Sequence, residues 1–418
     1  MLVFTDANSE TFIPNGFLAI PRKNVDRVRL ETAVPPVFGK EEIMKHVLLS
    51  FSLIICLAGF VFAEGTPEQE GASAPAAQTS PEMRTIIDMA GNSITIPAEG
   101  ATFGIFGGPI SQIPAVLGVT DSVVAVTKGA QMMEFMRTID PTIETKPAPR
   151  STNGNINVEE LMIADPDCVI AFDVDGNIVK EQTDIQVIFL TGTMQDGFEE
   201  LKEEALFFGD VFMQPDRAKT YVDYLDETLD LLETRLGSIP KEKKIKVFIG
   251  EGPTHLATLG GDTFISQWLD AAGMRNAVFE VDTAGGHQEG LHSGFLEISM
   301  EQVILSNPDI IIIDTGKSEE LYEDPKWQEI SAIKNRQVYR VPTGVFLWSR
   351  PSLESAVTYP LWLAYKAYPE LFADRSLADR YKDFYKTIFS YEPDDETVSR
   401  IINGQMGKVV FGQIDKKR

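Results

Sequence analysis

The chain has 418 residues, of which 43% are hydrophobic and 24% are charged, and its formal net charge is −25. This length suffices for two domains with separate cores, and the composition is ordinary for a globular protein. The strong negative charge argues against a nucleic-acid partner, because no basic surface is available to neutralise phosphates, and it disfavours binding to anionic lipid.

Near the N-terminus, residues 44–63 have the pattern of a secretory signal peptide. A short basic start precedes an apolar run that ends in the small-residue cleavage signal Val61-Phe62-Ala63. The run is too short for a comfortable transmembrane helix. We therefore expect an exported protein, periplasmic or otherwise extracytoplasmic. We also expect translation to begin at Met44, with residues 1–43 as an upstream extension that is not part of the natural chain.

The chain contains two cysteines, Cys56 and Cys168. Cys56 lies within the signal segment, where a lipoprotein signal would have small residues before it. The preceding residues 53–55 are Leu-Ile-Ile, so lipid anchoring through Cys56 is the weaker alternative to cleavage after Ala63. Cys168 alone cannot form an internal disulfide in the mature chain, so the cysteines do not locate the protein.

A tether and a first α/β lobe are predicted next. Residues 64–84 are rich in Glu, Pro, Ala, Ser and Gln and predict a flexible tether. In residues 85–214, a hairpin around Gly91 is followed by short apolar strands that alternate with helices. The strands are predicted at Thr102–Phe106, Ser122–Val126, Cys168–Phe172 and Gln186–Leu190, and the helices at Gln112–Leu117 and Val158–Ala164. This alternation predicts a mainly parallel, helix-covered sheet.

One long helix interrupts this alternation. Apolar residues spaced by three and four from Ala218 to Leu236 predict a helix over 216–236, within a linking segment at 215–238. At ~1.5 Å per residue this helix is about 30 Å long, which spans a whole domain. A rigid helix of this length would fix the separation of two lobes and limit how far they hinge.

A second α/β lobe with a helical tail is predicted over residues 239–418. Strands are expected at Lys246–Ile249, Ile310–Ile313 and Gln337–Val341, and helices at Thr263–Ala272 and Met300–Ser306. The tail, from Leu353 to about Ile402, is predicted to be helical and carries many aromatic residues.

One segment occurs twice, on opposite sides of the long helix. In both Val158–Asp167 and Met300–Asp309 a Glu lies seven residues before a Pro, and Pro-Asp opens a buried strand. The simplest explanation is two lobes of like topology. Coincidence is the alternative, since Pro-Asp is a common way to leave a helix.

These features resemble the solute-binding proteins of iron-siderophore, haem and vitamin B12 ABC importers, a family of metal-chelate receptors with a helical backbone. The resemblance runs from Ile86 to Tyr391 and depends on the order of several weak motifs. Besides both copies of the repeat, they are Ile87-Asp88-Met89-Ala90-Gly91-Asn92, Leu117-Gly118-Val119-Thr120-Asp121, Asp324-Pro325-Lys326-Trp327, Asn335-Arg336-Gln337-Val338-Tyr339 and Leu361-Trp362-Leu363-Ala364-Tyr365-Lys366.

The resemblance implies two Rossmann-like lobes joined by one long α-helix, with a ligand cleft between them. It also implies that one acidic residue on each lobe docks onto basic residues of the transmembrane subunits of an ABC permease. By position in the motif these residues are Glu159 and Glu301. The alternative is that both are N-terminal helix acids favoured by the helix dipole.

Ligands of open α/β sheets bind beyond the carboxyl ends of the strands. The loops after the predicted strands are Gly107-Gly108-Pro109, Lys128–Arg137, Asp173–Asn177, Glu251–His255, Gly285–His292, Thr315–Lys317 and Thr343–Arg350. In the last of them, Arg350 offers a planar fork for oxyanion groups, while Trp348, with Phe346, offers a flat apolar wall. The alternative is a packed aromatic residue beside a surface arginine.

Two other groups are candidate ligand contacts. His287 and His292 share a glycine-rich loop, where imidazoles could bind iron, although no third ligand lies at a fixed spacing. Met132 and Met133, in the loop that begins at Lys128, could contact a large apolar ligand or bind haem iron. Core or lid packing is the alternative for the methionines.

The sequence therefore predicts a monomeric, non-enzymatic receptor with no intrinsic cofactor, whose ligand is an iron chelate such as a ferric siderophore. Haem, cobalamin and oxyanions such as molybdate are alternative ligands of the same fold. A chelatase-like metal-handling enzyme and a surface sensor are alternatives of another class. A hydrolase is not indicated, since no Gly-x-Ser-x-Gly or His-Glu-x-x-His motif is found.

Overall fold

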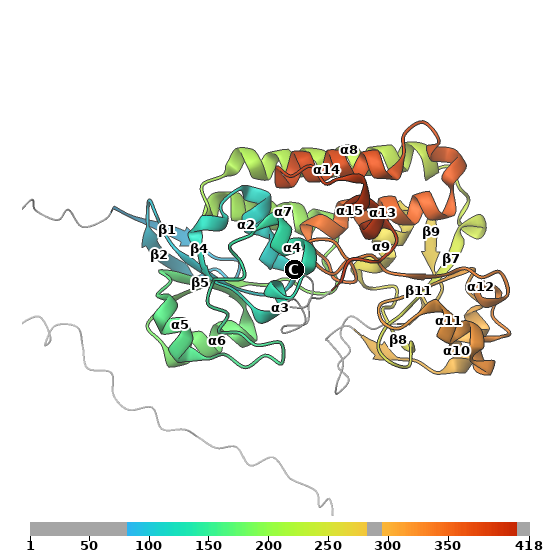
Figure 1. Cartoon of the computed structure of the whole chain (residues 1–418), viewed down its shortest axis with the longest axis horizontal. Coiled ribbons are helices and arrows are strands. Elements are labelled where there is room, and N and C mark those ends of the chain that lie inside the picture. The colour runs from blue at the N-terminus through green and yellow to red at the C-terminus, as the bar shows by residue number, and fades with distance from the viewer. Residues whose placement is uncertain (1–81, 282–294, 408–418) are drawn as a thin grey trace, which may run out of the picture. The chain divides into compact units, whose positions relative to one another are not determined.

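The computed structural model describes residues 82–281 and 295–407, all within one compact unit of the chain (Figure 1). The predicted signal peptide with Cys56, nearly all of the tether, and both His287 and His292 lie outside the described residues. Where the chain is described, no helix is long and apolar enough to cross a membrane.

The first half forms a hairpin and a parallel sheet. In the hairpin, β1 (Met83–Ile87) pairs antiparallel with β2 (Ser93–Pro97). The sheet has the strand order β4-β3-β5-β6, and all its pairs are parallel. Its strands are β3 (Phe103–Phe106), β4 (Val123–Ala125), β5 (Cys168–Phe172) and β6 (Gln186–Leu190). The predicted parallel sheet is therefore confirmed in this half.

Short helices follow most of these strands. They are the 3₁₀ helices Pro109–Gln112 and Thr120–Ser122, and α2 (Ile113–Leu117), α3 (Lys128–Gln131), α4 (Glu134–Ile139), α5 (Val158–Ala164), α6 (Asp173–Gln182) and α7 (Phe198–Val211). Gly118 ends α2 in the left-handed region with φ of 73°, which is why a glycine stands there.

The long helix is present and unbroken as α8 (Pro215–Leu236), with 22 residues. It begins with proline at its first turn, where a missing backbone N–H costs nothing. Its buried face carries Ala218, Tyr221, Leu225, Thr228, Leu232 and Leu236, and packs against α2 and α7 of the first half. It also contacts helices α9, α13 and α14 of the second half (Figure 1). The helix α8 thus packs against both halves.

A second parallel sheet lies in the second half, with the order β12-β11-β7-β9. Its strands are β7 (Ile245–Gly250), β9 (Met274–Asn276), β11 (Ile310–Ile313) and β12 (Val338–Arg340). In each sheet the first strand along the chain lies between the second and third, and the fourth lies outside the third. The two halves therefore have the same topology, as the repeat predicts.

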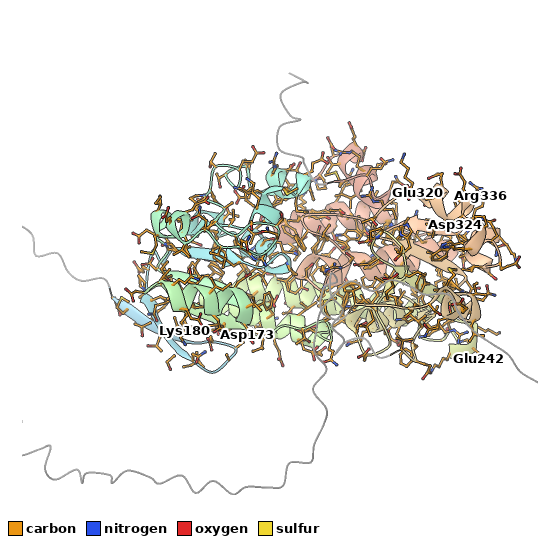
Figure 2. All side chains as sticks on the ribbon, turned by 90° about the horizontal axis from the view of Figure 1, so that it is seen from below. Asp173, Lys180, Glu242, Glu320, Asp324 and Arg336 are labelled. Atoms are coloured by element: carbon orange, nitrogen blue, oxygen red, sulfur yellow. The ribbon has the colours of Figure 1, made fainter. Side chains whose placement is uncertain are left out.

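The helices of the second half and a short ribbon complete the fold. They are the 3₁₀ helices Lys241–Lys243, Pro325–Trp327 and Pro369–Phe372, the ribbon strands β8 (Ala257–Thr258) and β10 (Leu296–Glu297), and α9 (Phe264–Ala271), α10 (Met300–Ser306), α11 (Ser318–Glu323), α12 (Ser331–Lys334), α13 (Leu353–Ala367), α14 (Leu377–Phe389) and α15 (Asp395–Ile402). Charged side chains such as Asp173, Lys180 and Glu242 are exposed at the surface (Figure 2).

The repeated segment plays the same structural role in each half. Asp167 accepts a hydrogen bond at Oδ2 from the backbone N–H of Thr102, at 2.8 Å. Asp309 does the same with the N–H of Lys246, at 2.9 Å. Each aspartate thus ties the start of the third strand to the start of the first strand of its own sheet. These two bonds align the halves residue by residue, since Thr102 corresponds to Lys246.

Candidate ligand-binding site

A cavity of about 610 Å³ lies at the carboxyl ends of three parallel strands of the second sheet. Glu251 directly follows β7, Asp314 follows β11, and Val341 follows β12. This edge is where open α/β sheets bind ligands, and the volume is that of a small-molecule site. The other lining residues are Gly252, Pro253, Ala257, Phe295, Thr315, Arg340, Pro342, Thr343, Leu347, Ser349, Arg350, Met406 and Gly407.

An almost buried ion pair forms one part of the cavity wall. Nη1 of Arg350 lies 3.0 Å from Oε1 and 3.2 Å from Oε2 of Glu251, and the two side chains are 14% and 7% exposed. The guanidinium carbon lies over the ring of Phe295, 4.6 Å from its centroid, which is a cation–π contact. These two contacts hold the guanidinium group at the cavity wall.

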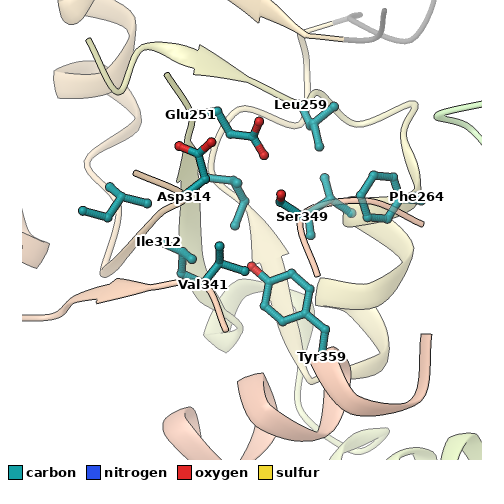
Figure 3. Close-up of a pocket in the computed structure, with 11 residues that line it drawn as sticks. Glu251, Leu259, Phe264, Ile312, Asp314, Val341, Ser349 and Tyr359 are labelled. Atoms are coloured by element: carbon teal, nitrogen blue, oxygen red, sulfur yellow. The ribbon is translucent and has the colours of Figure 1, made fainter. Parts of the chain in front are cut away.

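Burial raises the pKa of Glu251 to about 7, and the nearby charge of Asp314 acts in the same direction. Arg350 and a hydrogen bond with Ser349 oppose the shift. Figure 3 shows the carboxyl groups of Glu251 and Asp314 close together beside a second, small cavity of about 10 Å³ that reaches Ser349 and Tyr359. Such a space has room for about one water molecule.

A second buried carboxyl group, that of Glu354, holds the backbone of the loop that carries Arg350. Glu354, near the start of α13, accepts the backbone N–H groups of Val345 at 2.8 Å and Phe346 at 3.0 Å, and the hydroxyl of Tyr385 at 2.6 Å. Burial raises the pKa of Glu354 to about 7, against these hydrogen bonds. The backbone carbonyl of Arg350 also accepts the hydroxyl of Ser355. The arginine is therefore preorganised by protein contacts.

The two predicted aromatic contacts face the protein interior. Trp348 is fully buried, and its ring packs on those of Tyr359 and Tyr381. Phe346 is also buried and lies against Gly108 of the first half, where a Cβ atom would come 2.3 Å from the ring. In this structure Arg350 lines the cavity whereas neither aromatic ring does, so the ligand contacts expected of Trp348 and Phe346 stay predictions.

The candidates of the first half also lie away from this cavity wall. Nζ of Lys128 donates to Oε1 of Gln131 on the same short helix. Met132 is half-buried, and Met133 is buried in the hydrophobic core. A ligand contact by these three residues stays a prediction.

The C-terminal tail reaches the cavity and is held by the first half. Met406 and Gly407 are lining residues. Glu134, the first residue of α4, donates its N–H to the carbonyl of Gly407, and its carboxylate forms an ion pair with Arg400 at 2.8 Å. Through this contact the first half helps to place one side of the cavity.

Sequence reasoning selected the loops of this site but missed most of its polar side chains, namely Glu251, Asp314, Arg340 and Ser349. The positions of two of these residues in the sequence could have identified them. Glu251 and Asp314 are acidic residues directly after buried strands, at the edge where parallel strands bring such residues together.

Glu159 and Glu301 occupy the same position on equivalent helices, α5 and α10, and both are exposed. Hydrogen bonds from its own backbone N–H and from Ser299 lower the pKa of Glu301. One turn further on, each helix exposes a large aliphatic residue, Ile163 at 82% and Leu305 at 86%. Met162 and Ile304, the residues before them, are also exposed. Acidic and apolar side chains thus lie together on both halves.

Two α/β halves of one topology, joined by a long helix and carrying a cavity at strand ends, define a two-lobed ligand-binding protein. The chain belongs to the periplasmic binding protein family, whose profile matches residues 107–344. Proteins of this family are extracytoplasmic solute-binding components of ABC transporters, and the related proteins are binding proteins rather than enzymes.

Among curated proteins, the chain is similar to the molybdate-binding protein MolA of Haemophilus influenzae, with 22% identity over 341 residues, 75% of this chain and 93% of MolA. The structure of MolA bound to molybdate superposes with a TM-score of 0.64 and 21% identity, covering 74% of this chain and 99% of MolA. An ABC transporter solute-binding protein of Sulfurospirillum deleyianum gives 0.62 at 25% identity, with 76% and 98% coverage. CeuE of Helicobacter pylori, in a nickel–histidine complex, gives 0.61 at 23% identity, with the same coverage.

Proposed function

We propose that this chain is the receptor of an ABC importer for an anionic metal complex, in the first place an iron chelate such as a ferric siderophore. The observation that supports this most is the cavity of about 610 Å³ with two arginines, Arg340 and Arg350, on its wall. Guanidinium groups bind carboxylate and other oxyanion groups in a planar, two-pronged way.

The names of the related proteins suggest alternative ligands. MolA is named for molybdate, so molybdate is the principal alternative, and haem and cobalamin follow. A tetrahedral oxyanion would fill only a small part of the cavity, whereas a chelate would fill most of it. The size of the cavity therefore favours the chelate.

A thermal-shift screen of the purified protein would test the ligand class, using ferric siderophores, ferric citrate, haem, cobalamin and molybdate. A true ligand at 100 times its Kd stabilises the folded state by about 2.7 kcal/mol. We expect Arg350→Gln to weaken binding of an anionic ligand at least tenfold, and the exposed Arg336→Gln to leave it unchanged. A wild-type protein that none of these compounds stabilises would refute the proposed ligand class.

We further propose that Glu159 and Glu301, with the aliphatic residues Ile163 and Leu305 beside them, dock onto the paired transmembrane subunits of the permease. The arrangement occurs once on each half, which suits a partner that presents two similar surfaces. Its acidic groups suit basic residues on that partner. On each helix two adjacent apolar side chains are exposed, and contiguous apolar surface of this kind marks interaction sites.

Uptake assays with charge-reversal variants would test this docking. We expect Glu159→Lys and Glu301→Lys each to lower uptake, and the double variant or Ile163→Ser with Leu305→Ser to abolish it, all with normal ligand affinity. Glu319→Lys is the matched control, because this residue is an exposed acid at the start of another helix, α11. Normal uptake by the double variants would remove the docking role.

A further inference from the structure

The charge on the cavity wall is almost balanced before any ligand arrives. Among the described lining residues, the charged groups are two guanidinium groups, those of Arg340 and Arg350, and two carboxyl groups, those of Glu251 and Asp314. Arg350 is already paired with Glu251 at 3.0 Å, with both side chains largely out of water. An anion that binds Arg350 therefore brings a negative charge next to two others, and this costs free energy unless one carboxylate is neutralised.

Arg350 has hydrogen-bonding capacity left for a ligand while it stays paired. Its hydrogen bonds to described residues, to both oxygens of Glu251 and to the carbonyl and hydroxyl of Ser349, all use Nη1. Among the described residues no hydrogen bond ends on its Nε or Nη2. The guanidinium can therefore meet an oxyanion with these donors and keep Glu251 as a close neighbour.

Several titratable groups lie near Glu251, and they differ in burial and in their neighbours. Asp314 is less buried than Glu251 and accepts the N–H of Gly252 at 3.1 Å. Burial raises the pKa of Tyr359, which faces Glu251, so the phenol stays neutral. Burial lowers the pKa of His255, which faces Asp314 and Glu320, so this imidazole is neutral as well. Glu251, whose pKa burial raises to about 7, is the group poised to titrate.

We propose that Glu251 is a proton-linked counter-ion of the ligand site, which takes up one proton when an anionic ligand binds Arg350. In this step a proton from solvent forms an O–H bond at a carboxylate oxygen of Glu251. The positive charge of Arg350 is then balanced by the ligand in place of Glu251. The proposal rests on the proposed function, because it needs an anionic ligand in this cavity. It makes Glu251 the residue through which the affinity for anions depends on pH.

Because ligand binding is coupled to proton uptake by Glu251, the ligand affinity should depend on pH in one direction. Above the pKa of Glu251 in the free protein, each bound anion must bring a proton, so affinity falls as pH rises, by up to about tenfold per pH unit. Below that pKa the carboxyl group is already neutral and affinity levels off. Ligand binding and proton binding thus strengthen each other.

Titration calorimetry at pH 8 would test this, with sodium molybdate and ferric citrate as probes and buffers of different ionisation enthalpy. We expect the wild-type protein to take up close to one proton per bound anion. We expect Glu251→Gln to take up almost none, and to bind the anion about tenfold more tightly at this pH. Asp314→Asn is the matched control, because it removes a neighbouring charge while Glu251 still takes up a proton.

The outcomes separate this inference from the proposed function. Binding of a probe to the wild-type protein with a heat that is independent of the buffer would overturn the proton linkage alone. Persistent proton uptake in a folded Glu251→Gln protein would overturn the assignment to Glu251. Failure of the wild-type protein to bind either probe would count against anion capture itself, and so against the proposed function.

Discussion

Glu354 anchors the loop that carries Arg350, and replacing it should lower the stability of the fold by an amount that depends on the replacement. Its carboxyl group accepts three buried donors, the N–H groups of Val345 and Phe346 and the hydroxyl of Tyr385. The test is best done at pH 6, below the pKa of about 7 that burial gives Glu354, so that its carboxyl group is largely neutral in the folded protein, as its replacements are.

The number of donors left without a partner sets the expected losses. Each buried donor without a partner costs about 1–3 kcal/mol, so Glu354→Ala, which leaves three of them, should lower the free energy of unfolding by about 3–9 kcal/mol. Glu354→Gln keeps an acceptor for Val345 and Tyr385 but turns an amide N–H₂ toward Phe346, which costs about 1–3 kcal/mol. Tyr385→Phe removes only one donor and should cost about 1 kcal/mol.

Urea denaturation would give these free energies, and ligand affinity measured on the same samples would report on Arg350. Affinity should fall in the order of the stability losses, because the loop that positions the guanidinium loosens. The exposed Glu370→Ala serves as a control and should stay within about 0.5 kcal/mol of the wild-type protein. Equal stability of the wild-type protein and Glu354→Ala would refute the role of this carboxyl group as the anchor of the loop.

Two further predictions concern burial. Burial raises the pKa of Glu204 from 4.5 to about 8, so this group stabilises the folded state at low pH and loses that effect as pH rises through 8. The wild-type protein should lose about 2.5 kcal/mol of its free energy of unfolding between pH 6 and pH 8.5 through this group, and Glu204→Gln should lack that loss. The variant Glu203→Gln, at an exposed neighbouring position, should lose as much as the wild-type protein. Gly108→Ala should destabilise the fold by about 1–3 kcal/mol, because its Cβ would meet the ring of Phe346, whereas Gly129→Ala has space and should change little; equal melting temperatures of the two variants would contradict this.

Much of the fold could be predicted from local pattern. The apolar spacing of 216–236 predicted α8 to within one residue at its start, because an amphipathic face repeats over six turns of one helix. The Pro-Asp repeat predicted like topology because each copy opens an equivalent strand, β5 or β11. The packing of α13 against helices of both halves could not be predicted, since an apolar helix does not specify what it contacts.

The site was harder to predict, for reasons of distance and direction. Glu251 and Arg350 are far apart in the sequence, and their ion pair exists because β7 and the loop after β12 end at the same edge of the sheet. Within that loop, the sequence could not show that Arg350 lines the cavity while Trp348 is buried. That outcome depends on Tyr359 and Tyr381 of the tail, which pack around the indole.

The alignment of the two halves shows which residues of the first half stand where the second half has the two carboxyl groups of the cavity. Thr102 corresponds to Lys246 and Asp167 to Asp309, so Gly107 stands where the second half has Glu251, and Phe172 stands where it has Asp314. A Cβ on Gly107 would lie 3.0 Å from the ring of Phe172, so the two positions are neighbours in the first sheet, as the two carboxyl groups are in the second. The shared topology therefore fixes which two positions meet at the strand ends, and the residue types decide the result. Glycine with phenylalanine gives an apolar contact there, whereas two carboxyl groups give a polar site, in which Glu251 pairs with Arg350.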